Sequence, residues 1–457
     1  MPAIITDTFK KQFMQNIFDE VENLTGRYYV GIGKNDQWNA TETVPTPTDT
    51  PRTIREAQAA LQSVKAVAGV SYVIPRYNWT SGSTYSSYDD DITAIPSNSY
   101  YVLTEDNQVY ICLQQSKDAN GNANVSTVQP TGTSKNAFKT SDGYTWKFLY
   151  ALSAARSSAF LSANFVPVEK ILDSAGGPSL TAIEIQQATV QDSAVAGRIL
   201  NVVVTNPGTG YTSAPTVTIT GNTREIGDSA QAVATVANGS IAKIEMLNES
   251  AGSGKNYINA TVTLTGGGGS GGVARAVMGP QNGIGADPRD ELKATSLMFN
   301  AKPNGIEGGD FLAGTGVDFR QVMLIKNPKT DSASGTTLSA TTGKALKFLK
   351  TDLAFAGNLA VDELITSNTV PAAKAYVNQV SDSDVFYHQT DSTGYTPFGI
   401  GDTLTDEQGN TGTINHISAI DSAGLINTSG DVLYIENRAP VIRDASQTED
   451  IKVVVTL

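Results

Sequence analysis

Residues 433–457, "LYIENRAPVIRDASQTEDIKVVVTL", end the chain in a strand pattern of period two. Its apolar face consists of Ile451, Val453, Val455 and Leu457. Because an apolar terminal strand left unpaired is a sticky edge, we expect this strand to join a sheet and its apolar face to be covered. Upstream, Pro440 restricts Ala439 to extended backbone, so we expect Glu436–Pro440 to form the turn into the strand.

Strand patterns recur outward from this stretch as short β-branched or aromatic runs between turn residues, at 26–33, 70–79, 108–115, 144–152 and 317–328. Helical spacing occurs near the N-terminus, over 7–25 and 53–68. The first predicted helix carries its apolar stripe on Phe9, Phe13, Ile17, Val21 and Leu24. We therefore predict a mainly β, multi-domain chain with antiparallel sheets, a sandwich-like core and a few N-terminal helices.

Two segments differ in composition from the rest and read as inserted small β domains. Residues 187–280 are rich in Gly, Thr, Ala and Val, and "VVVTNPGTGYTSAPTVTITG" (202–221) is echoed by "IEMLNESAGSGKNYINATVTLTG" (244–266). Between the copies, Asn238-Gly239 predicts a hairpin. Residues 331–430 form the second segment, which leaves 1–186, 281–330 and 431–457 as the parts of one core.

The totals argue against several classes of function. The net charge of −13 repels phosphate, so nucleic acid is not an expected partner. We find no apolar run near the ~18 residues that span a bilayer, and residues 1–7 do not lead us to expect a secretory signal. Cys112 is the single cysteine and reads as a buried strand residue, and only His388 and His416 are available for metal or triad chemistry.

The remaining motifs do not complete a site. "GGGGSGG" (266–272) lacks the Lys-Ser/Thr of a phosphate loop and reads as a hairpin tip. "DANGNANVSTVQ" (118–129) begins like a calcium loop but lacks its Gly and its final Glu. The acids 89–91, with Asp382 and Asp384, read as solvated turn residues. The aromatics Tyr85, Tyr88, Tyr100 and Tyr101, near Trp79, read as core. We expect no catalytic residue, no metal site and no cofactor.

Several short blocks, taken in order, resemble a known family. "YIENRAPVI" (434–442) and "QTEDIKVVVTL" (447–457) resemble the C-terminus of the baseplate wedge subunit, gene product eight, of T-even-like contractile-tailed bacteriophages. "VIPRYNW" (73–79), "DGYTWKFL" (142–149), "FVPV" (165–168) and "FRQVMLIKNP" (319–328) follow the same order, with "YVGIGKNDQW" (29–38) as a looser match. The resemblance covers about 1–185, 281–330 and 431–457, and leaves out both inserted segments.

The resemblance implies a structural protein of the virion, assembled in the host cytoplasm, that pairs as a homodimer in each wedge. It also implies contacts with the wedge proteins that resemble gene products six, seven and ten, and no membrane. A glycan- or fibre-binding module in the inserted domains is the alternative. The residues that carry the resemblance are Pro75, Arg76, Trp79, Asp142, Gly143, Tyr144, Trp146, Phe319, Arg320, Gln321, Asn437, Arg438 and Pro440.

Overall fold

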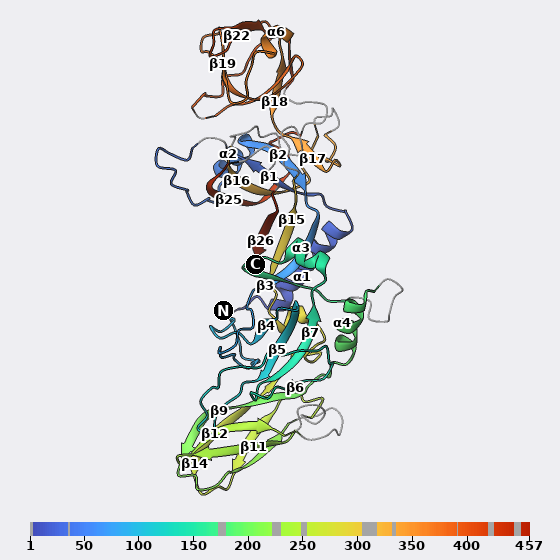
Figure 1. Cartoon of the computed structure of the whole chain (residues 1–457), viewed down its shortest axis with the longest axis vertical. Helices are drawn as coiled ribbons and strands as arrows, with labels where there is room; N and C mark the ends of the chain where they lie inside the picture. The colour runs from blue at the N-terminus through green and yellow to red at the C-terminus, as the bar shows by residue number, and fades with distance from the viewer. Residues whose placement is uncertain are drawn as a thin grey trace. The chain divides into compact units, whose positions relative to one another are not determined.

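The computed structural model of the chain describes residues 3–34, 37–171, 180–221, 230–247, 254–303, 318–330, 335–390, 392–418, 425–442 and 449–457 (Figure 1). The protein is mainly β, with 40% of its residues in strands, 13% in helices, and antiparallel sheets throughout, as predicted. Contacts divide the chain into two compact units. Unit 1 comprises 1–12, 71–296 and 457, and unit 2 comprises 13–70 and 297–456. The five predicted segments follow other boundaries and stay a prediction.

A four-stranded sheet with an aromatic core organises the first part of unit 1. Its order is β4 (Tyr101–Leu103), β5 (Gln108–Gln114), β7 (Thr145–Ala151) and β6 (Phe138–Lys139). Beside it, β3 (Gly69–Pro75) pairs with β8 (Phe165–Val168), and the helices are α3 (Ala154–Phe160), α4 (Ala182–Asp192) and α5 (Pro288–Glu291). The predicted strands at 70–79, 108–115 and 144–152 are confirmed, and Cys112 is fully buried.

The repeat segment of unit 1 builds two further sheets around one core. A sheet of order β12-β11-β10-β13 lies with the pair β14-β9, and both contribute to one apolar cluster. Their bounds are β9 (Ile199–Thr209), β10 (Thr216–Thr220), β11 (Ala232–Ala237), β12 (Ser240–Met246), β13 (Thr261–Thr265) and β14 (Ser270–Met278). The predicted hairpin is confirmed, because Asn238 and Gly239 both take positive φ between β11 and β12.

The two copies of the sequence repeat meet through their matching strands. β10 pairs antiparallel with β13, so that Val217 lies opposite Leu264 and Ile219 opposite Val262. The two copies thus bury a shared face, as expected, because neither β unit could bury that face alone.

The glycine-rich stretch 266–272 is a short connection followed by strand, since β14 already begins at Ser270. Glycine is required in this stretch because the ring of Tyr211, which is 7% exposed, packs directly against its backbone. A Cβ at Gly269 would lie 2.5 Å from Cγ of Tyr211, and one at Gly272 would lie 2.5 Å from its hydroxyl oxygen. The run therefore packs against an aromatic ring instead of forming a free loop along its whole length.

A five-stranded sheet organises unit 2, in the order β17 (Thr342–Lys344), β2 (Leu61–Ala66), β1 (Tyr28–Gly33), β16 (Asp318–Lys326) and β25 (Asp431–Ile442). The predicted helix over 53–68 is wrong in its second half. Helix α2 covers only Pro51–Ala59. Residues 61–66 form strand β2 instead, which is hydrogen-bonded to β1 on one side and to β17 on the other. Pairing on both edges outweighs the local helical pattern.

The block Glu436–Pro440 is not a turn, contrary to prediction. It lies inside β25, where the register against β16 shifts: Phe319 faces Val441, but Gln321 faces Asn437. The extra residues form a β-bulge opposite Arg320, which is where a strand tolerates Pro440 without its N–H.

The terminal strand β26 (Ile451–Thr456) is the edge neighbour of β15 (Ser296–Ala301), so the prediction that it joins a sheet is confirmed. Its predicted apolar face is only partly covered. Val453 is 2% exposed, whereas Leu457 is 43% exposed and lies beyond the strand.

Residues 345–418 of unit 2 have their own sheet and core. The order is β23-β22-β19-β20-β21-β18-β24, with bounds β18 (Lys347–Lys350), β19 (Leu364–Ser367), β20 (Lys374–Ser381), β21 (Asp384–His388), β22 (Thr403–Thr405), β23 (Thr411–Thr413), β24 (His416–Ser418) and helix α6 (Leu353–Ala356). A separate cluster of buried hydrophobic residues, which includes Phe355 and Tyr387, forms the core of this part of the chain.

Helix α1 (Asp7–Glu22) confirms the helix predicted at the N-terminus, but not its apolar stripe. Met14 and Val21 are the buried residues, while Phe9 is 64% exposed and Phe13 is 50% exposed. The buried stripe is therefore rotated from the predicted one, and Leu24 lies beyond the helix end with positive φ.

Candidate functional site

The residues that carry the family resemblance gather in two clusters, one in each unit. In unit 1 the link is Ser126, which is fully buried. The indole nitrogen of Trp79 donates to Ser126 Oγ at 3.1 Å, and Ser126 Oγ donates to Asp142 Oδ2 at 3.0 Å. Two blocks that are separate in the sequence, 73–79 and 142–149, thus meet through one buried hydroxyl.

Asp142 is the acceptor at the centre of this first cluster. Its Oδ2 also accepts from the backbone N–H of Thr127 at 2.8 Å and of Val128 at 2.9 Å, and its Oδ1 accepts from the hydroxyl of Thr140. Burial alone raises the pKa of Asp142, but these hydrogen bonds outweigh it and hold the pKa below its usual range. The next residue, Gly143, has φ +89°, which an L side chain rarely adopts.

Aromatic rings complete the first cluster. Tyr144 stacks on Trp146 with ring centroids 5.8 Å apart, and Tyr85 packs edge-on against both rings. The Tyr144 hydroxyl donates to the backbone oxygen of Asn124 at 2.6 Å. All three rings are buried, as are Tyr88, Tyr100 and Tyr101, which confirms the prediction that these aromatics are core residues.

Pro75 and Arg76 tie the end of β3 to its neighbours. The Tyr101 hydroxyl donates to the carbonyl oxygen of Pro75 at 2.8 Å, and Arg76 Nη1 donates to the carbonyl oxygen of Ser162 at 2.9 Å. Arg76 therefore acts as a connector between segments of unit 1 and not as an exposed recognition residue.

The second cluster, in unit 2, fixes the segment 38–45 against β16 and β25. Arg320 is 3% exposed. Its Nε and Nη2 both donate hydrogen bonds to the Glu42 carboxylate, and the contact from Nη2 is the shorter one, at 2.8 Å. Gln321 donates to Asn437 Oδ1 at 2.8 Å, and Asn437 donates to the carbonyl oxygen of Pro45 at 2.9 Å. The pairing of Arg320 with Glu42 is bidentate and directional, a geometry for which arginine is suited.

The other members of the second cluster differ in burial. Phe319 is 3% exposed, and Pro440 is half-buried in the bulge. Arg438 is exposed, and its backbone oxygen accepts from Trp38 Nε1 at 2.9 Å. Trp38 and Arg438 stand 400 positions apart in the sequence.

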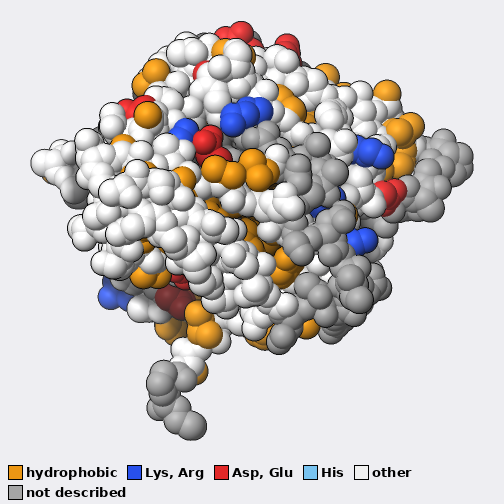
Figure 2. All heavy atoms as spheres, turned by 90° about the horizontal axis from the view of Figure 1, so that it is seen from below, with side chains coloured by type: hydrophobic (Ala, Val, Ile, Leu, Met, Phe, Trp, Pro, Cys, Tyr) orange, Lys and Arg blue, Asp and Glu red, His pale blue; other side chains and the backbone are white. Residues whose placement is uncertain are grey.

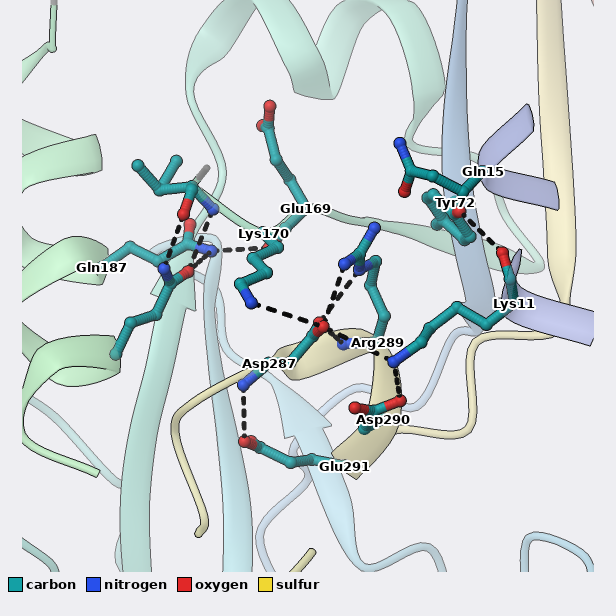
Figure 3. A network of polar contacts seen from close by, with 12 residues as sticks. Lys11, Gln15, Tyr72, Glu169, Lys170, Gln187, Asp287, Arg289, Asp290 and Glu291 are labelled. Carbon is teal, nitrogen blue, oxygen red and sulfur yellow. Dashed lines mark hydrogen bonds and ion pairs between the residues drawn. The ribbon is translucent and has the colours of Figure 1, made fainter. Parts of the chain in front are cut away.

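A charged network that the sequence did not reveal surrounds α5 in unit 1 (Figure 3). Asp287 caps this helix and accepts from Arg289 Nε and Nη2, both at 2.9 Å. The ammonium groups of Lys11 and Lys170 lie 3.7 Å and 3.9 Å from Asp287 Oδ2, and Lys11 also binds Asp290. Although burial opposes it, Arg289 holds the pKa of Asp287 below its usual range.

Glu291, at the end of α5, is fully buried. Its Oε1 accepts from the backbone N–H of Gly285 at 2.6 Å and of Asp287 at 3.2 Å, while its Oε2 has no hydrogen-bond partner among the described residues. Burial raises the pKa of Glu291 to about 8. In the sequence, Asp287-Pro288 is the only local signal for this network, because Asp-Pro is typical of a helix start. Lys11, which binds Asp290, lies 279 positions away from it, so no local pattern could reveal that contact.

Three of the acids singled out in the sequence, Asp89, Asp90 and Asp118, make structural contacts. Asp89 and Asp90 are not solvated turn residues, because both bind Arg275 of β14 and Asp90 also accepts from the Met278 N–H at 2.9 Å. Asp118 caps its own loop, accepting from the N–H groups of residues 120 and 122.

Two other residues weighed for chemistry are Asp384 and His388. Asp384 pairs with Lys350 at 2.8 Å, and burial lowers the pKa of His388 to about 4, so that it is neutral at physiological pH. In the part of the chain that the structure describes, no group of three or more His, Cys, Asp or Glu side chains is placed to hold a metal ion.

Comparisons with known proteins give no match, either to a protein-family model or to a curated protein sequence. None of the helices in the described ranges combines the length and apolar composition needed to cross a membrane.

Proposed function

We propose that the chain is a structural subunit of the tail baseplate wedge of a contractile-tailed bacteriophage. It would be a part of the virion, assembled in the host cytoplasm, that scaffolds the baseplate without catalysing a reaction. The proposal begins from the ordered sequence blocks and from the mainly β fold in which they lie.

The observation that carries the proposal is where those blocks lie. They are the residues that join distant parts of the chain: Trp79 with Asp142 through Ser126 in unit 1, and Gln321 with Asn437 in unit 2. Side chains committed to such internal cross-links favour a scaffold, since a catalytic constellation needs groups aimed at a substrate.

The proposed partners are a second copy of the chain within each wedge and the wedge proteins that resemble gene products six, seven and ten. Nucleic acid is not among them, because the net charge is −13. On the face seen in Figure 2, the charged side chains of the described residues are scattered and form no extended basic stripe.

The test is to place a nonsense codon in the gene of the phage that encodes this chain and to complement it from a plasmid. The expected result is particles that lack a complete baseplate, with normal tails restored by the wild-type plasmid. Mass spectrometry of cross-linked, purified tails would then find this chain joined to itself and to baseplate proteins. Intact baseplates without the chain would refute the proposal.

A binding module in the segment 345–418 is the second candidate, favoured by exposed apolar side chains on its connections. Val370 is 98% exposed, Ile400 69% and Tyr395 56%. A large apolar side chain that is exposed to solvent is available to pack against a partner. Tail particles carrying Tyr395→Ala should then adsorb to host cells more slowly but assemble normally; unchanged adsorption would refute this candidate.

A further inference from the structure

The strand β13 lies at the edge of its sheet in the repeat segment of unit 1. The sheet has the order β12-β11-β10-β13, and among the described residues β13 forms a ladder on one side only, against β10. An edge strand presents unpaired backbone N–H and C=O groups to any extended strand that can reach them. The outer edge of β13 is therefore a place where another chain can add a strand.

This edge lacks the features that usually prevent such pairing. Edge strands commonly carry a charged residue or a proline, which discourages the addition of a further strand. The opposite edge of the same sheet, β12, carries Lys243 and Glu245, and the edge strand β26 carries Lys452. By contrast, residues 256–274, which include β13, contain no charged residue and no proline.

The apolar side chains of β13 are incompletely covered. Val262 and Leu264 pack against the core of the repeat segment but are only half-buried, whereas Ile219 on the inner strand β10 is 7% exposed. The three threonines of β13 alternate with them and are exposed on the outer face. A strand added beyond β13 would cover the open side of Val262 and Leu264.

The sequence repeat shows which strand fits this edge. β10, "TVTIT" (216–220), and β13, "TVTLT" (261–265), are nearly identical, and they pair antiparallel with threonine opposite threonine. Thr218 faces Thr263 at the centre of this ladder, and Val217 faces Leu264. Since β13 already pairs in this way with a near copy of itself, β13 of a second chain has the matching side chains.

We propose that two copies of the chain associate through β13, edge to edge and antiparallel, so that their four-stranded sheets form one continuous sheet. A two-fold axis at Thr263 would place it opposite the partner's Thr263, and Val262 opposite the partner's Leu264. These cross-strand pairs are those of the β10–β13 ladder, with the partner's Leu264 in the place of Ile219. The surface lies outside the sequence blocks that carry the family resemblance.

This edge would be a surface for the second copy that the proposed function includes, and its setting in a wedge rests on that proposed function. Pairing of five residues from each chain buries less than the ~1,200–2,000 Å² of a standard interface. We therefore expect a weak dimer of the isolated chain, with a Kd on the order of 10–100 μM. The high local concentration in an assembly would populate it.

The experiment is sedimentation velocity of the full-length protein, from about tenfold below to about tenfold above that Kd. Thr263→Lys should raise the Kd at least about tenfold, because it places two ammonium groups opposite each other at the two-fold axis. Thr218→Lys is the matched control, since Thr218 is exposed and faces Thr263 but lies on β10, inside the sheet. Its Kd should stay within about threefold of the wild-type value.

Cysteine cross-linking tests the register of the two strands. Thr263→Cys should give a disulfide-linked dimer under mild oxidation, because residues that face each other in neighbouring strands have the Cα separation that a disulfide needs. Thr218→Cys should not, and the native Cys112 is fully buried and does not compete.

Three outcomes would overturn the proposal: a chain that stays monomeric at every concentration, equal dissociation constants for Thr263→Lys and Thr218→Lys, or equal cross-linking of the two cysteine variants. The nonsense-codon experiment on phage particles does not depend on these results, so the β13 interface and the proposed function can fail separately.

Discussion

Asp142→Ala should destabilise unit 1 strongly, because it removes the acceptor of the first cluster. The variant leaves the hydroxyl of the fully buried Ser126 and the N–H of Val128 without their acceptor. Hydrogen bonds to a charged group contribute about 1.5–3 kcal/mol each, and they are not additive. Since water can reach part of this half-buried site, we expect a loss of about 3–5 kcal/mol, a large share of a typical domain's ~5–15 kcal/mol.

Urea denaturation followed by tryptophan fluorescence measures this loss. Trp79 and Trp146 both belong to the first cluster and are two of the chain's three tryptophans, so the signal reports on this region. Asp118→Ala is the matched control, since Asp118 accepts similar local N–H hydrogen bonds but in an exposed loop, where water replaces them. Equal midpoints for the two variants would refute the reasoning.

The same site predicts a pH dependence. The pKa of Asp142 is lower in the folded protein than its ordinary value of 3.8, so the carboxylate contributes stability above that pH. This contribution is lost as the pH falls through the folded pKa. The difference in stability between wild type and Asp142→Asn should therefore be full at neutral pH and shrink below pH 3.8; a constant difference would contradict this assignment.

Three further perturbations test other parts of the fold. Because the pKa of Glu291 is raised from 4.5 to about 8, the wild type should lose stability on the order of a few kcal/mol as the pH rises between these values, and Glu291→Gln should remove that slope in pH-dependent melting. Gly269→Ala should cost about 1–3 kcal/mol in urea denaturation, because its Cβ would overlap the Tyr211 ring; an unchanged midpoint would show that the ring can move. Deleting residues 450–457 should leave β15 without its edge strand and expose the surface under Val453, giving aggregation in light scattering; a monomeric product with unchanged melting would contradict this.

Patterns of short range predicted the fold class and most individual strands. The hairpin at Asn238-Gly239 was predictable because both residues tolerate positive φ, and the pairing of β10 with β13 follows the sequence repeat. The prediction was wrong where long-range pairing decides the outcome. Residues 61–66 became a strand between two others, and Glu436–Pro440 became a bulge because β16 continues past it.

The polar clusters were even less accessible to sequence reasoning. Asp142 was singled out only through the family resemblance, and Ser126, which joins it to Trp79, carries no local signal. The pairing of Arg320 with Glu42 likewise joins residues 278 positions apart. A lone charged residue in a strand pattern does not show whether it is buried, since its partner is chosen by the folded chain.

Hydrogen-bond accounting separates the two kinds of buried polar group in this protein. Around Asp142 and Arg320 the charged group meets enough donors or an opposite charge, which is the condition for burying it at tolerable cost. These groups hold the fold in register and need no ligand. At Glu291, by contrast, Oε2 has no hydrogen-bond partner among the described residues, and burial raises the pKa of the carboxyl group to about 8. Burying this carboxyl group as the neutral acid avoids the desolvation of a charge, so Glu291 lies in the interior without a cation bound to it.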